Sequence, residues 1–65
     1  MEHDELVQRL NELVLEHGDL DVAINLMSEA LFVDQLQLKR MKMRKLRLKD
    51  EITKIKSKLI PDIEA

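Results

Sequence analysis

The stretch LFVDQLQL, residues 31–38, decides whether the chain folds back on itself or continues as one rod. Asp34 has a side chain suited to a helix N-cap, and Gln37 follows three residues later, which is the spacing of a capping box. A carboxylate inside a continuous coiled-coil seam would lose its hydration without gaining a partner. The stretch therefore predicts that a second helix begins at residue 34.

Outward from this stretch, apolar residues recur at alternating intervals of four and three, which is the spacing of a coiled-coil seam. In the first half the seam positions are Leu6, Leu10, Leu13, His17, Leu20, Ile24, Met27 and Leu31. In the second half they are Leu38, Met41, Lys45, Leu48, Ile52, Ile55 and Leu59. We predict helices over about residues 4–29 and 34–60, joined by a connection over residues 30–33. Asp4 is the predicted N-cap of the first helix, and Pro61 ends the second.

The distribution of charge favours a hairpin over a rod. Residues 1–34 contain nine acidic residues and one arginine, whereas residues 35–65 contain ten basic and four acidic residues. Folding one half against the other brings opposite charges together along the seam. The predicted fold is all-α: a two-helix antiparallel hairpin with a coiled-coil-like seam. One unbroken helix of about 55 residues would also preserve the alternation of three and four, and it remains the alternative.

The chain is short for an independent domain. Its 65 residues form at most one domain, residues 1–65, and chains below roughly 70–80 residues usually need reinforcement. The sequence has no cysteine, which excludes disulfides and thiolate metal sites. We therefore expect self-association into a homo-oligomer, in a four-helix arrangement. Five apolar residues away from the seam are the predicted contacts, unless another protein covers them: Leu15, Val22, Leu26, Met43 and Leu46.

The residue types argue against an enzyme. There is no Cys or Tyr, and neither a His-Glu-x-x-His motif nor a glycine-rich phosphate loop occurs. We predict no catalytic residue, no cofactor and no bound metal. No apolar run approaches the ~18–20 residues of a membrane span, and the acidic start of the chain is unlike a signal peptide. The expectation is a soluble cytoplasmic protein without a membrane partner.

His17 is the one histidine at a seam position, and Asp21 follows one helical turn later. A carboxylate there can orient the imidazole and raise its pKa, which would make a pH-sensitive contact. The simpler interpretation is a partly buried histidine satisfied across the seam. A metal site would need further ligands, for which the second helix offers only Asp50 and Glu51.

Residues 39–49 contain seven basic residues and no acid. We predict that Lys42, Lys45 and Lys49 pair with acids of the first helix, while Arg40, Arg44 and Arg47 stay free and could bind phosphate. Against nucleic acid stand the acidic isoelectric point, near 5.6, and the absence of Trp and Tyr. The first functional prediction is a non-enzymatic protein-interaction module. The alternative is an accessory protein that binds nucleic acid through the second helix.

Two motifs resemble those of a known family. Residues 41–52, MKMRKLRLKDEI, are similar to the Leu-Lys-Lys-x-Lys-Leu-x-Leu-Lys-Asp-Glu-Ile signature of the small bacterial YdcH-like family, a domain of unknown function. His17, Leu20, Asp21 and Ile24 match its His-x-x-Leu-Asp-x-x-Ile motif. The resemblance implies a helical hairpin and no assigned activity. The apolar connection at residues 30–33 departs from the family's polar turn.

Overall fold

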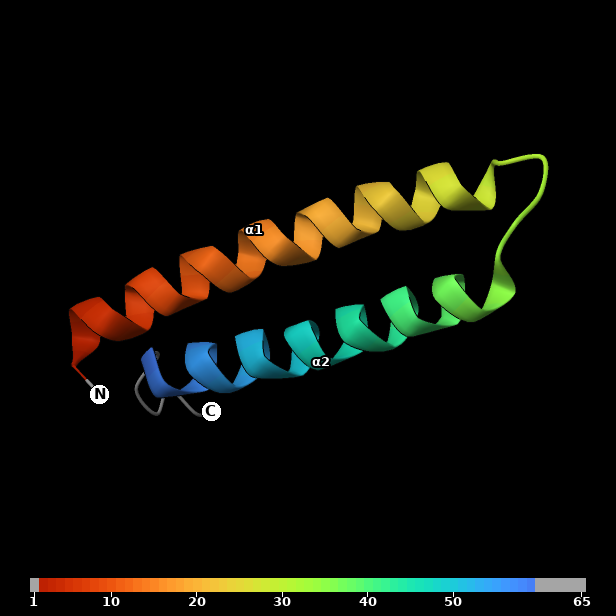
Figure 1. The fold of residues 1–65 in the computed structure, drawn as a ribbon. Helices are drawn as coiled ribbons and strands as arrows, with labels where there is room; N and C mark the ends of the chain where they lie inside the picture. Colours follow the sequence, from red (N-terminus) through yellow and green to blue (C-terminus); the bar gives the residue numbers. More distant parts are fainter. Residues whose placement is uncertain (1, 60–65) are drawn as a thin grey trace, which may run out of the picture.

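The computed structural model describes residues 2–59 and contains two long helices that lie side by side (Figure 1). Helix α1 spans His3–Ser28 and helix α2 spans Gln35–Leu59. The chain reverses between them, so the start of α1 and the end of α2 lie at the same end of the molecule (Figure 1). The predicted antiparallel hairpin is confirmed, and the single rod of about 55 residues is excluded.

The helix ends follow local hydrogen bonding. Helix α1 begins earlier than predicted, because the backbone N–H of Glu2 donates a hydrogen bond to the carboxylate of Glu5 (3.2 Å). The prediction of Asp4 as the N-cap was wrong: Asp4 lies inside the first turn, where its negative charge suits the helix dipole. Helix α2 begins as predicted, with the backbone N–H of Gln37 donating to the carboxylate of Asp34 (3.0 Å). The predicted end at Ile60 lies outside the described residues.

Replacing Asp34 by Ala is expected to lower the free energy of unfolding by about 1 kcal/mol, because the Gln37 N–H loses its acceptor. Urea titration followed by circular dichroism measures the change. Asp34→Asn, which keeps a cap oxygen, should recover most of the loss. An Ala variant as stable as the wild type would show that the cap does not hold the start of α2.

The core is a single line of side chains between the helices. Five of residues 2–59 are buried, and all five are seam positions of the sequence pattern: Leu6, Leu13, Ile24, Leu38 and Leu48. The molecule measures 47 × 24 × 15 Å, so the helices form one layer, with no second layer above or below them. The predicted seam position Leu31 is an exception. It lies in the connection, after α1 has ended, and is 89% exposed.

Candidate functional site

The two flanks of the seam differ in charge. On the first, which we call the paired flank, Arg9 donates to the carboxylate of Glu51 (3.4 Å). Arg44 binds Glu16 on the same flank through both Nε, at 2.9 Å, and Nη2. Both pairs link α1 to α2, and each has an acid on one helix and an arginine on the other. Pairs this exposed each contribute about 0.2–1 kcal/mol, so they align the helices more than they stabilise them.

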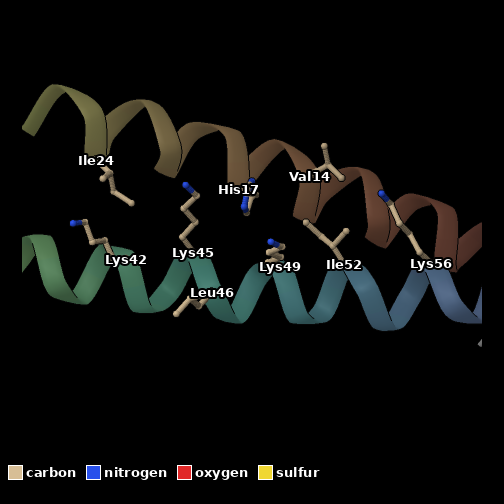
Figure 2. Close-up of a pocket in the computed structure, with 9 residues that line it drawn as sticks. All are labelled: Val14, His17, Ile24, Lys42, Lys45, Leu46, Lys49, Ile52 and Lys56. Atoms are coloured by element: carbon tan, nitrogen blue, oxygen red, sulfur yellow. The ribbon is translucent and has the colours of Figure 1, made fainter. Parts of the chain in front are cut away.

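The opposite flank, which we call the lysine flank, is an open groove of about 650 Å³. Lys42, Lys49 and Lys56 lie seven residues apart along it, which places them on one side of α2 at intervals of about 10.5 Å. The groove is lined by these three lysines together with Val14, His17, Ile24, Lys45, Leu46 and Ile52. Figure 2 shows Lys45 and Lys56 extending from α2 towards α1, while His17 and Ile24 point from α1 towards α2. The groove therefore combines an apolar lining with concentrated positive charge.

One acid of α1, Asp21, forms an ion pair with a lysine of this flank. The Lys45 ammonium donates a hydrogen bond to the Asp21 carboxylate, and this bond, with the lysine's positive charge, lowers the pKa of Asp21. Lys45 was predicted to pair with an acid of the first helix, and this is confirmed. The same prediction for Lys42 and Lys49 was wrong, since within residues 2–59 neither makes an ion pair. The acid of α1 on this flank, Asp21, binds Lys45 instead, and the apolar Val14 also lines the groove.

The Asp21–Lys45 ion pair should make the stability of the fold depend on pH. Because the pKa of Asp21 is lower in the folded chain than in the unfolded chain, the pair stabilises the fold above the ordinary carboxyl pKa of about 4. That contribution disappears as the pH falls through the lowered value. Asp21→Asn should be less stable than the wild type at pH 7 and equally stable near pH 2, in urea titrations at each pH. A difference that persists unchanged in acid would contradict the pairing.

His17 is half-buried on the lysine flank. It lies one turn from Asp21, as predicted, and its charge contributes slightly to lowering the pKa of that carboxyl. The hydrogen bond of Asp21, however, goes to Lys45. A pH-sensitive contact between His17 and Asp21 stays a prediction. Among residues 2–59, no three His, Asp or Glu side chains gather into a group that could hold a metal ion.

The three arginines predicted to stay free fall into two groups. Arg44 was wrongly assigned, because it borders the seam and binds Glu16. Arg40 and Arg47 are exposed, and within the described part of the chain they make no ion pair. Binding of phosphate by these two side chains remains a prediction.

The five predicted self-association residues are all exposed, but they do not share one face. Leu15 and Val22, seven residues apart, lie on the side of α1 opposite the seam, because Leu15 is two residues beyond the buried Leu13. We call the group Leu15, Val22 and Leu26 the α1 edge. On α2, Leu36 and Met43 lie seven residues apart on the outer side, and Leu46 lies between them and the lysine flank, whose groove it also lines. We call these three residues the α2 edge. The two edges face away from each other, so no single partner surface covers both.

The connection is a third apolar feature. Leu31 and Phe32 are both nearly fully exposed at the turn end of the hairpin. The sequence shows this apolar connection as a departure from the polar turn of the family it resembles. Phe32 is the one aromatic residue of the chain.

These features define an antiparallel coiled-coil hairpin with one paired flank, one lysine flank and two apolar outer edges. The chain belongs to the family described as "Protein of unknown function (DUF465)", whose family model matches residues 10–56. This confirms the resemblance to the YdcH-like family, which is the same family. No curated protein and no solved structure matches the chain. Within residues 2–59, neither helix combines the length and apolar character that crossing a membrane requires.

Proposed function

We propose that the hairpin is a non-enzymatic interaction module that associates with other copies of itself through its outer edges. The observation that carries the proposal is the exposure of the two edges, beside a core of five buried side chains in the described part of the chain. Leu15 is 69% exposed and Leu46 is 63% exposed. Both residues lie inside their helices and not at the helix ends. Contiguous exposed apolar groups of this kind mark interaction sites. A chain of 65 residues also gains stability when copies bury such edges.

The test compares edge variants with the wild type by sedimentation equilibrium from about 1 to 300 µM. The wild type should exceed the monomer mass of 7.7 kDa as concentration rises. Leu15→Gln with Leu26→Gln should shift the association to at least about tenfold higher concentration, because apolar contact area is lost. Leu31→Gln with Phe32→Gln, in the still more exposed connection, is the control and should associate as the wild type does. A wild type that stays monomeric throughout would contradict the proposal.

A second candidate function is supported by the lysine flank. Lys42, Lys49 and Lys56 present a row of positive charge beside apolar side chains, which suits a polyanion such as a nucleic acid backbone. If it binds, affinity for labelled single-stranded and duplex oligonucleotides should fall steeply between about 50 and 200 mM salt. Changing Lys42, Lys49 and Lys56 to Gln should abolish this oligonucleotide binding. Changing Arg40 and Arg47 to Gln tests whether those two arginines contribute to the binding as well. The absence of binding at 50 mM salt would contradict this candidate.

A further inference from the structure

The α1 edge carries a row of acids beside its apolar residues. Glu5, Glu12 and Asp19 lie seven residues apart on the outer side of α1, and all three are exposed. Residues seven apart stand almost directly above one another on a helix, so these carboxylates form a line parallel to Leu15 and Val22.

The α2 edge carries the opposite charge in the same spacing. Arg40, Arg47 and Lys54 lie seven residues apart and are exposed, and they flank Leu36 and Met43. Each edge therefore has one apolar line and one charged line, with acids on α1 and bases on α2.

The two edges match when α1 of one copy lies antiparallel to α2 of another. Placing Leu15 against Met43 also places Val22 against Leu36, since both pairs have the same sum of residue numbers. In this register each acid of the α1 edge also lies opposite a base of the α2 edge. The offset between them along the helix axis is about one residue, or 1.5 Å. The three cross-copy charge pairs are Glu5 with Lys54, Glu12 with Arg47 and Asp19 with Arg40. The helices thus repeat, between copies, the antiparallel acid-to-base pairing seen inside the chain at Glu16 and Arg44.

Pairing of like edges gives the opposite result. Two α1 edges packed antiparallel set acids against acids, and two α2 edges set bases against bases. The contact that the charges favour is therefore between different edges. Such a contact is heterologous: each copy uses its α1 edge on one neighbour and its α2 edge on another, so copies continue into a ring or an open row.

We propose that the chain self-associates by docking the α1 edge of one copy onto the α2 edge of the next. This inference rests on the proposed self-association and specifies its surface, its partner and its direction. It replaces the four-helix arrangement expected from the sequence with a head-to-tail contact, because the two edges lie on opposite sides of the molecule.

Charge reversal and mixing test the direction of the contact. One variant carries Glu12→Lys and Asp19→Lys, and the other carries Arg40→Glu and Arg47→Glu. Each variant alone sets like charges against each other at two of the three cross-copy pairs, so its association should be at least about tenfold weaker than that of the wild type. In an equimolar mixture, every contact between the two variants again sets acids against bases. The average molecular mass of the mixture should therefore return towards the wild-type value. A single chain with all four substitutions should also associate like the wild type.

The controls separate charge at the edges from charge elsewhere. Exchanging Glu16 and Arg44, as Glu16→Arg with Arg44→Glu, keeps their internal pair and should leave association unchanged. Circular dichroism confirms the helical content of each variant. Should a reversal variant lose helicity, Glu12→Gln with Asp19→Asn replaces it and should weaken association without repulsion.

Two outcomes overturn the inference in distinguishable ways. If each reversal variant associates as well as the wild type, or if mixing restores nothing, the head-to-tail contact is wrong while self-association stands. If the wild type itself stays at 7.7 kDa over the whole concentration range, the proposed function fails as well.

Discussion

Replacing Leu13 by Ala is expected to lower the free energy of unfolding by roughly 2–5 kcal/mol. Leu13 is 1% exposed, the lowest value among the buried residues, and it lies at the middle of α1. The loss combines the transfer free energy of the missing methyl groups with the cost of the cavity they leave. Domains of this size are stabilised by only about 3–10 kcal/mol in total, so this single change removes a large share of the free energy of unfolding.

Urea titration at a fixed low concentration, followed by circular dichroism, measures the effect. Leu31→Ala is the matched control, because it makes the same chemical change at an 89% exposed position. Its free energy of unfolding should stay within about 0.5 kcal/mol of the wild-type value. Equal effects at positions 13 and 31 would contradict the assignment of Leu13 to the core.

Replacing Leu48 by Ala should cost a similar amount, roughly 2–5 kcal/mol, from the other side of the seam. Leu48 is 2% exposed, whereas Leu46, two residues earlier, is 63% exposed and points away from α1 (Figure 2). Leu46→Ala is therefore a control within the same helix. At concentrations where the chain is monomeric it should change stability by less than about 0.5 kcal/mol. If Leu46→Ala were the more damaging change, α2 would be rotated about its axis relative to the structure.

The seam could be predicted from the sequence because its signal is repetitive. The alternation of three and four named all five buried residues, and the N-cap at Asp34 located the reversal of the chain. Each of these features depends on neighbours within a few turns of one helix. The local spacing of residues was therefore enough to predict the seam and the start of α2.

The charge pairing across the seam could not be predicted in the same way. Whether Arg44 or Lys42 meets an acid depends on how α2 is rotated against α1, and both residues lie beside the seam. The structure places Arg44 against Glu16, whereas Lys42 lies on the other flank, where Asp21 binds Lys45. The separation of the outer apolar residues into two opposite edges depends on the same rotation. The sequence pattern shows only that each of these residues lies away from the seam.

Every assignment of flank and edge depends on the reversal of the chain between α1 and α2. Spin labels on cysteines introduced at Gln8 and Ser57 measure that reversal directly, because both residues are exposed and the chain has no cysteine of its own. Labelled protein is diluted with unlabelled protein so that only distances within one chain are recorded. The hairpin predicts a distance of about 20–30 Å, set by two helix widths and the label arms. A distance near the ~74 Å that 49 residues of continuous helix would span would contradict the hairpin and, with it, both edges.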